Sequence, residues 1–405
     1  MESVVEYRLT EIQEALRDAV RSFVRKEVMP HALRREWIED PAERLPWDWI
    51  EALSRMGVRT MTVPKEFGGP GADTITACLI GEELASGDLG LAVIFDQVWK
   101  FVPLITTACS EEQRDRYLPQ FMSDDRYLLA VGLHEDNAGS DHFLPYNVPP
   151  HGAKTTAVQD SNGDWIINGA KSYISSGGVA RLNVILARTQ PGTGGVNGLG
   201  AFFVELGSPG FSIGRIENKI GQRLVQNGEL IFDNCRVPAR NVLGDPTNGL
   251  ASLRDHLRGR GMPEAAATTL GVARAAFEAA LDHARSHVQG GTEIINHDII
   301  ALMLADMDLQ LETARLLIWR AAWAADHSEN LDLRLPAMAK QYASEVAVDV
   351  CIKAMEIFGG AGIMMELPMQ KYVRDSLTFL HSEGTNQIMR LRRANILRGG
   401  PPAPF

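Results

Sequence analysis

Apolar residues recur at intervals of three and four along the first part of the chain, the spacing of amphipathic helices. Thr10 and Gln13 have the spacing of a capping box, which predicts a helix over 10–29 that Pro30 ends. We therefore expect residues 1–126 to form an N-terminal helical domain. Its other helices are predicted at 46–57, 73–86, 88–108 and 111–122.

The pattern changes between residues 127 and 240 to short alternating runs punctuated by Gly and Pro, which is typical of strands. Asn162-Gly163 is the turn signal of a hairpin. This stretch is expected to form a small middle antiparallel β domain, arranged as a barrel. Its strands are predicted at 155–158, 165–174, 182–187, 200–206, 211–214 and 229–232.

Helical spacing returns in residues 241–405, where Pro263 favours the first turn of a helix. Long helices joined in succession pack as a bundle, so this part is expected to be a C-terminal four-helix bundle. The predicted fold class is α+β multidomain, in the order helical, β, helical. The C-terminal helices are predicted at 263–288, 297–327, 336–358 and 384–398.

Composition excludes some function classes. The formal net charge of −11 offers no basis for binding nucleic acid. No apolar run reaches the roughly 20 residues of a membrane span, and residues 1–8 lack the apolar core of a secretory signal. The four cysteines are far apart and form no CxxC pair, which favours reduced thiols and a cytoplasmic protein.

One acidic residue, Glu383, stands where a loop meets the closing helix, just before Gly384-Thr385. A carboxylate held there beside an apolar wall is a candidate general base. Spacing alone favours the other interpretation, in which Glu383 complements the dipole of the helix that follows.

Polar residues also crowd the start of the β segment. A metal site is one interpretation, but no pair has the helical His spacing of a metallohydrolase, so a polar loop is favoured and no metal is expected. Segments 133–141 and 171–178 expose backbone amides and hydroxyls that suit a planar, polar-edged cofactor. The candidate metal ligands are His134, Glu135, Asp136, Asp141, His142 and His151.

Several motifs in one order make the chain resemble the acyl-CoA dehydrogenases over nearly its whole length. They are AGSD (138–141), INGAKSYISSGG (167–178), KIGQR (219–223), FDNCRVPARNVLG (232–244), LMLADM (302–307) and FGGAGI…RD…SEGTNQIMR (358–390). The resemblance implies FAD, α,β-desaturation of an acyl-CoA in fatty-acid or side-chain β-oxidation, and a homotetramer or homodimer. It also implies electron-transfer flavoprotein as the electron acceptor.

The resemblance assigns a role to individual residues. Glu383 matches the glutamate that takes the α-proton, while flavin N5 takes the β-hydrogen as hydride. Such a base needs a dry pocket that raises its pKa, and the thioester oxygen needs a hydrogen bond from the backbone amide of that glutamate. The residues expected to bind FAD are Leu133, His134, Ser140, Tyr173, Ser175, Gly359, Gly360, Thr385 and Gln387.

The acyl pocket is expected to include Phe95, Trp99, Ser382 and Gly384. Phe95 and Trp99 narrow a straight tunnel, and small Ser382 admits bulk, which together favour a short, branched or cyclic acyl group. Lys100 is expected to be solvated, as lysines on helices usually are, with contact to a second substrate carboxylate as the alternative.

The sequence also departs from the family pattern. Gly261 occupies the position of the relocated base in branched-chain members, and Glu264, one turn away, is a reserve candidate. Met262 replaces an arginine, the Arg-x-x-Phe-Gly motif is missing, and Glu356 replaces a glutamine on the cross-subunit path to FAD. An insertion with three prolines covers 142–152.

These departures keep three hypotheses open. The leading one is an FAD-dependent acyl-CoA dehydrogenase. The second is a flavin oxidase or monooxygenase of the same fold, against which the retained Glu383 argues. The third is a weakly active or non-catalytic subunit of a heterotetramer, in which a related chain supplies the missing FAD contacts.

Overall fold

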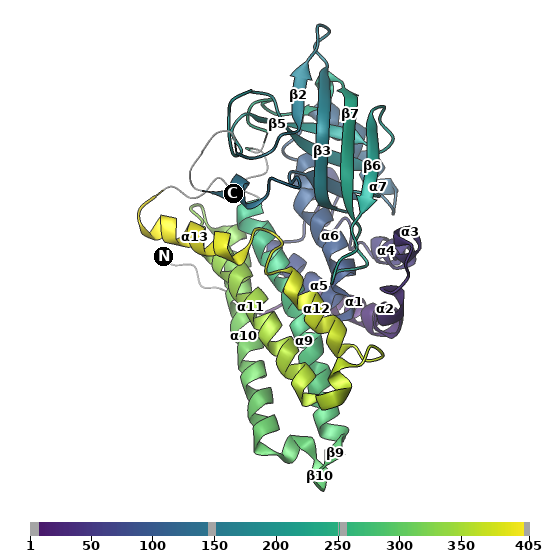
Figure 1. Cartoon of the computed structure of the whole chain (residues 1–405), viewed down its shortest axis with the longest axis vertical. Coiled ribbons are helices and arrows are strands. Elements are labelled where there is room, and N and C mark those ends of the chain that lie inside the picture. Colours follow the sequence, from purple (N-terminus) through teal and green to yellow (C-terminus); the bar gives the residue numbers. More distant parts are fainter. Residues whose placement is uncertain (1–7, 145–150, 250, 252–256, 401–405) are drawn as a thin grey trace.

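The computed structural model describes residues 8–144, 151–249, 251 and 257–400. The predicted helical, β, helical order is confirmed. In Figure 1 the strands of the large sheet gather at one end of the molecule, and the long C-terminal helices extend away from them toward the β9–β10 hairpin. The prolines of the predicted insertion, at positions 145, 149 and 150, lie outside the described residues.

The N-terminal helices surround α5 and α6, in which every residue is buried. Helices that are apolar on all sides belong in a core, and α5 packs directly on α9 of the C-terminal region. The two helical regions therefore share one core. The helices are α1 (Glu11–Phe23), α2 (Met29–Arg35), α3 (Pro41–Arg44), α4 (Trp47–Arg55), α5 (Thr74–Gly87), α6 (Leu89–Phe101) and α7 (Glu111–Ser123).

The first helix begins as predicted and ends differently. Thr10 caps α1, and the Gln13 side chain completes the capping box. Pro30 does not end the helical run, because a π-helical turn, η1 (Val24–Val28), leads into α2. Pro30 stands in the first turn of α2, where a backbone N–H is not required, so the predicted stop was wrong.

The middle region is one sheet with the strand order β6-β7-β3-β2-β4-β5-β8 and with β1 beside β4. Most pairs are antiparallel, as expected, but β1 and β2 pair in parallel with β4. The short β1 was not predicted. The strands are β1 (Leu129–Gly132), β2 (Thr156–Gln159), β3 (Trp165–Ser175), β4 (Leu182–Arg188), β5 (Leu199–Glu205), β6 (Phe211–Ile216), β7 (Asn227–Val237) and β8 (Val242–Leu243).

The C-terminal helices pack against one another around α9 and α11. Of these helices, only α12 was not predicted. A small hairpin of β9 (Val288–Gln289) and β10 (Thr292–Glu293) joins α9 to α10. The helices are α9 (Met262–Ser286), α10 (Asp298–His327), α11 (Arg334–Ile357), α12 (Met369–Thr378) and α13 (Asn386–Leu397).

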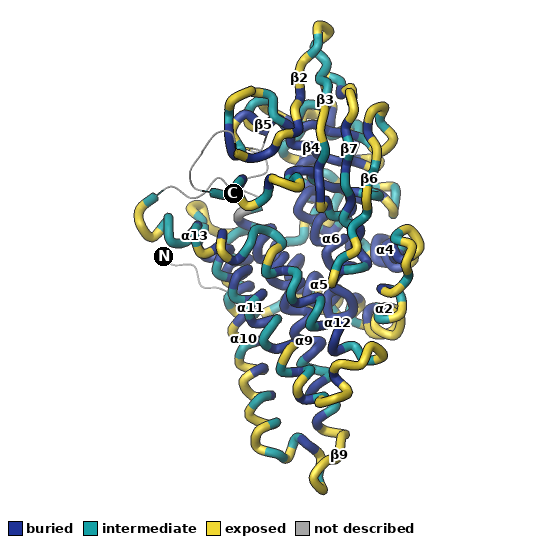
Figure 2. The backbone as a smooth tube through the Cα atoms, in the orientation of Figure 1, coloured by how far each residue is buried: buried dark blue, intermediate teal, exposed yellow. Residues whose placement is uncertain are grey.

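Burial follows this arrangement (Figure 2). The dark-blue core lies where α5, α6 and α9 meet beneath the sheet, and the far end of the bundle near β9 is exposed. No helix among the described residues is long and apolar enough to cross a lipid bilayer. The four cysteines are free thiols.

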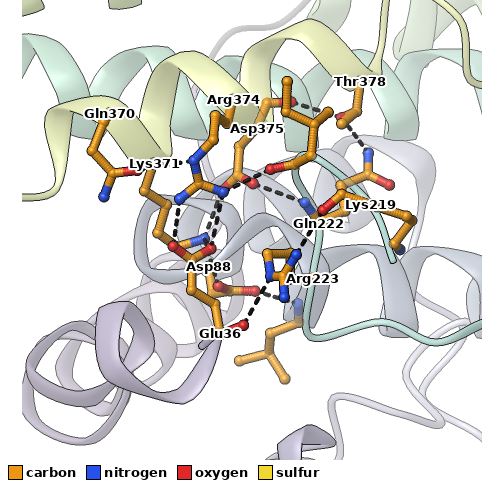
Figure 3. Close-up of polar contacts among 12 residues, drawn as sticks. Glu36, Asp88, Lys219, Gln222, Arg223, Gln370, Lys371, Arg374, Asp375 and Thr378 are labelled. Atoms are coloured by element: carbon orange, nitrogen blue, oxygen red, sulfur yellow. Dashed lines mark hydrogen bonds and ion pairs between the residues drawn. The ribbon is translucent and has the colours of Figure 1, made fainter. Parts of the chain in front are cut away.

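A buried polar network ties the three regions together (Figure 3). Lys371 of α12 lies 2.8 Å from Asp88, which caps α6, and 2.6 Å from Asp375. Asp375 accepts the backbone N–H of Gln222, in the loop between β6 and β7, at 2.8 Å. Arg374 adds an ion pair with fully buried Glu36 at the end of α2. The network therefore fixes α12, and the turn that follows it, relative to the sheet and the N-terminal helices.

Candidate active site

A cavity of about 440 Å³ opens between loops of the sheet, the end of α6 and the turn that leads into α13. It brings together many of the residues that the sequence singled out, from segments far apart in the chain. The predicted residues that line it are Leu133, His134, Ser140, Tyr173, Ser175, Ser382, Glu383, Gly384 and Thr385.

The sheet side of the cavity is shaped by an irregularity at the end of β3. The pairing of β3 with β7 shifts register between Lys171 and Ile174, and Tyr173 has a left-handed φ of 64°. Asn227 holds this backbone by donating from Nδ2 to the Tyr173 carbonyl at 2.8 Å. The Tyr173 side chain is 52% exposed and lines the cavity. Such strain in a non-glycine residue is typical of a functional site.

His134 lines the same side, on the loop after β1. Burial lowers the pKa of its imidazole, with the Glu383 carboxylate opposing that effect. The neighbouring acids in the suspected metal cluster have other contacts: Glu135 pairs with Lys171 at 2.7 Å, and Asp141 accepts backbone N–H groups of Gly139 and Gly152. Among the described residues, no group of three metal-ligating side chains gathers.

Glu383 lines the same cavity from the turn between α12 and α13, with a left-handed φ of 58°. The cap of α13 is Thr385, whose hydroxyl accepts the backbone N–H of Ile388. The Glu383 side chain instead reaches α6. The geometry therefore assigns the helix cap to Thr385 and leaves the carboxylate of Glu383 at the cavity.

Two side chains of α6 bind the same oxygen of Glu383. Gln97 donates from Nε2 to Oε1 at 3.1 Å, and Lys100 Nζ lies 3.0 Å from Oε1. Lys100 also lies 2.7 Å from Asp96. The Lys100 and Asp96 side chains are buried, at 0% and 1% exposure, whereas that of Glu383 keeps 27% toward the cavity.

This contact changes the electrostatics of the candidate base. Burial raises the pKa of the Glu383 carboxyl, but the Lys100 ammonium and the hydrogen bonds from Lys100 and Gln97 outweigh it, so the pKa lies below its ordinary value. The direction is opposite to the one expected for a base in an apolar pocket. The expectation that Lys100 is solvated was wrong, because Asp96 and Glu383 together compensate the charge of its buried ammonium.

The structure does not bring Phe95 and Trp99 to the cavity. Both are buried in the core beneath it, where the Trp99 indole donates to the carbonyl of Val58 at 2.8 Å. The face of α6 that lines the cavity carries Gln97 and Phe101 instead. These two positions were missed because the sequence pattern of an all-apolar helix does not indicate which side faces a pocket.

The reserve base, Glu264 of α9, is fully buried and does not line the cavity. Burial, followed by the negative charge of Asp96, raises the pKa of its carboxyl well above the ordinary value. Gly261 lies against Lys100, since a Cβ there would stand 3.3 Å from Lys100 Cε. The lysine side chain therefore fills the space beside residue 261, the position that the resemblance gives to the relocated base of branched-chain members.

Three predicted cofactor residues lie outside the cavity. Gly359 and Gly360 are exposed in a 3₁₀ turn, η8 (Gly359–Ile363), that follows α11. Gln387 is exposed on the first turn of α13. None of the three lines the cavity of the same chain.

Comparisons with known proteins identify the family to which the chain is similar. Three domain models of acyl-CoA dehydrogenases match the chain: the N-terminal domain at residues 10–125, the middle domain at 130–235 and the C-terminal domain at 259–397. An acyl-CoA dehydrogenase of Bacillus subtilis is 36% identical over 396 residues, which cover 97% of this chain and 99% of that protein.

Solved structures give the same result. Butyryl-CoA dehydrogenase from Megasphaera elsdenii superposes with a TM-score of 0.88 at 30% identity, covering 97% of this chain and 100% of that one. A chain in a structure named for the electron transferring flavoprotein of Acidaminococcus fermentans matches with a TM-score of 0.86 at 32% identity, covering 97% and 99%.

Proposed function

The chain belongs to the acyl-CoA dehydrogenase family of oxidoreductases, and from that premise we propose that it desaturates an acyl-CoA thioester between the α and β carbons. The observation that carries the proposal is the partly exposed Glu383 carboxylate, which lines the same cavity as Tyr173 and Ser140. A carboxylate in that place can take a proton from a carbon atom held in the cavity.

Members of this family use FAD, and the residues of the cavity fit it. Hydroxyls of Ser140, Ser175 and Thr385 line the walls, and an aromatic side chain, Tyr173, is left half-exposed in a strained conformation that a planar partner would explain. We infer that these residues, with Leu133 and His134, hold the flavin. When bound, FAD supplies the acceptor for the β-hydrogen and its electron pair.

The protein's own groups have three tasks in this proposal. Glu383 takes the α-proton through the oxygen that faces the cavity, and its backbone N–H donates to the thioester oxygen as negative charge develops there. Ser382 and Gly384 border the thioester. Phe101, together with Leu257 and Met262 on the helical side, supplies apolar surface for a compact acyl group.

We also propose that electron-transfer flavoprotein accepts the electrons and that the protein is a cytoplasmic oligomer, as its free thiols and exposed apolar side chains suggest. These apolar side chains follow one face of α10 at Ile299, Leu302, Leu309 and Leu316.

Gly359, Gly360 and Gln387 are then proposed to contact the FAD of a neighbouring subunit, either the same chain or a related one. FAD measured per protomer after expression of this chain alone separates the two: full, tight occupancy in a homomer excludes the heteromer.

Anaerobic titration with a panel of acyl-CoA thioesters tests the function. The proposal predicts that at least one thioester bleaches the flavin without oxygen, and that Glu383→Gln keeps FAD but loses about 10²-fold or more of the bleaching rate. Glu264→Gln is the matched carboxylate control and should still bleach. Loss of bleaching in the control alone would assign the base to Glu264. Bound flavin that no thioester bleaches would favour the oxidase or non-catalytic alternatives.

A further inference from the structure

An ammonium group stands directly behind the candidate base. Lys100 Nζ is 3.0 Å from Glu383 Oε1 and 2.7 Å from Asp96 Oδ2, and its side chain has no exposed surface. Burying a lysine costs several kcal/mol unless its charge is compensated. The two carboxylates provide that compensation, so the ion pair with the base is part of the folded core.

Both α6 contacts engage the same oxygen of Glu383. Lys100 and Gln97 bind Oε1, while the carboxylate keeps its exposed fraction toward the cavity. The arrangement fixes the rotation of the carboxylate and leaves Oε2 as the oxygen for the α-proton. The turn also holds the backbone of Glu383 in a left-handed conformation.

Other charged groups surround this pair on every side. Asp96 comes from α6, Glu264 from α9, and His134 from the loop after β1. Lys340 of α11 is a second nearby ammonium, but its hydrogen bonds go to the carbonyl of Gly384 and to Asn386. Arg392 of α13 and His381 also line the cavity. Among the described lysines and arginines, Lys100 is the one paired with the Glu383 carboxylate.

The Lys100 side chain packs closely against Gly261. A Cβ at Gly261 would lie 3.3 Å from Cε and 3.5 Å from Cδ and Cγ of the lysine side chain. The lysine is held at its head by two carboxylates and cannot withdraw without losing them. Gly261 and Lys100 thus form one packing unit beside the base.

We propose that Lys100 is a positioning residue for Glu383, which holds the carboxylate ionised and turned to present Oε2 to the substrate, and that Asp96 moderates its effect. The inference rests on the proposed function, because it concerns the same base. Glu383 remains the catalytic residue, and Lys100 acts only through it.

Substitution of Lys100 and substitution of its partner Asp96 are expected to shift the pKa of Glu383 in opposite directions. Lys100→Met keeps the length of the side chain and removes the ammonium, so burial is opposed only by the Gln97 hydrogen bond and the more distant charge of Lys340, and the pKa of Glu383 rises. Asp96→Asn keeps the shape and removes a competing negative charge, so Lys100 acts on Glu383 more strongly and the pKa of Glu383 falls.

The experiment measures the pH profile of anaerobic flavin bleaching in both variants. The acid limb of the profile is the pH range in which the rate rises as Glu383 loses its proton. This limb should move up by about one pH unit or more in Lys100→Met and should move down in Asp96→Asn. At pH values above the limb, Lys100→Met should regain much of the wild-type rate. Lys353→Met is the matched control, because Lys353 forms an i,i+4 pair with Asp349 on a more exposed part of α11 and should not move the limb.

A second measurement does not depend on turnover. Infrared difference spectra across the same pH range report the protonated carboxyl band of Glu383, identified by its loss in Glu383→Gln. Opposite shifts of this band in the two variants support Lys100 even if no thioester bleaches the flavin, in which case only the proposed function fails. Equal rate losses at every pH, with an unmoved band, would overturn the role of Lys100 while leaving the function intact. If Lys100→Met does not fold, Lys100→Gln repeats both measurements with a neutral side chain that can still hydrogen-bond to Asp96, because the Asp96→Asn shift alone also follows from the loss of repulsion between two carboxylates.

Discussion

Lys340 of α11 supports the turn between α12 and α13 that carries Glu383, donating from Nζ to the carbonyl of Gly384 at 2.7 Å and to Asn386 Oδ1 at 2.9 Å. The side chain is fully buried. Burial lowers the pKa of Lys340 to about 7, with the charge of Glu383 opposing that effect. Two lysines therefore flank this turn: Lys100 holds the carboxylate, and Lys340 holds the backbone one residue later.

Lys340→Met should loosen this turn. The substitution removes the ammonium donor of the Gly384 carbonyl and one of two donors of Asn386 Oδ1, which keeps the Ser344 hydroxyl at 3.2 Å, and a loss of about 1–3 kcal/mol in the free energy of unfolding is expected. Because the Glu383 backbone is then less constrained, we expect the bleaching rate to fall about tenfold. The acid limb of its pH profile should rise by less than in Lys100→Met, because the charge of Lys340 lowers the pKa of Glu383 less than that of Lys100. Urea denaturation measures the effect on stability, and stopped-flow bleaching measures the effect on the rate. An unchanged rate would show that the turn keeps its conformation without Lys340.

Lys371→Met should affect stability more strongly than any change at the cavity. It would leave Asp88, Asp375 and Glu36 clustered in the core without the ammonium that they share (Figure 3). Removal of one partner from a buried ion pair costs about 3–5 kcal/mol. Adding Asp88→Asn removes one of the stranded charges and should recover part of the loss. A double variant no more stable than the single one would contradict this account.

The fold could be predicted to a large extent because its signals are local. Helical periodicity located α5 and α6, and the Asn162-Gly163 turn located the β2–β3 hairpin. The errors arose where tertiary context overrides local preference. Pro30 was expected to end a helix, but a π-helical turn places it in a tolerated position. The four-residue β1 has too short a pattern to be recognised, although it carries the loop of His134.

The sequence predicted the residues that the loops bring to the candidate site, but not Lys100, which α6 brings there. Glu383 and Tyr173 each lie within a run of consecutive motif residues, SEGTNQIMR and INGAKSYISSGG, so the sequence alone indicates them. It does not indicate Lys100, because its partner Glu383 lies far along the chain and the i,i+4 spacing to Asp96 is equally typical of a solvated pair. Only the packing of α6 against the turn after α12 shows that this pair is buried. The raised pKa expected for the base was wrong for the same reason.

Tyr173 allows a test that separates cofactor binding from folding. Its left-handed φ of 64° is costly for tyrosine and free for glycine, while its half-exposed side chain contributes little to the core. Tyr173→Gly should therefore leave the free energy of unfolding of the apoprotein unchanged or raise it by about 1 kcal/mol. The same change should weaken FAD binding, measured by fluorescence titration, because an aromatic contact is lost. Tyr173→Phe is the control and should retain FAD.

His142 gives a prediction for the pH dependence of stability. Burial lowers the pKa of its imidazole to about 4, with the nearby His134 acting in the same direction. The unfolded chain binds a proton on this histidine below its ordinary pKa of roughly 6.5, while the native state stays neutral. The stability that His142 contributes is thus complete above that value and is lost as the pH falls toward 4, by about 3 kcal/mol in all. His142→Phe should flatten this part of the curve of unfolding free energy against pH, and an unchanged slope would contradict the assignment.

Gly261→Ala tests the packing beside the base with a single methyl group. The added Cβ would stand 3.3 Å from Lys100 Cε, which is closer than an ordinary contact, and the lysine head is held by Asp96 and Glu383. We expect the lysine side chain to give way by a few tenths of an ångström, and a shift that lengthens its contact with Glu383 raises the pKa of that carboxyl. We therefore expect the acid limb of the bleaching profile to move in the same direction as in Lys100→Met, by less than about one pH unit. In the Lys100→Met background the same alanine should produce no further shift, since the charge it displaces is gone. Additive shifts in the double variant would mean that Gly261 acts on Glu383 by a route that does not involve Lys100.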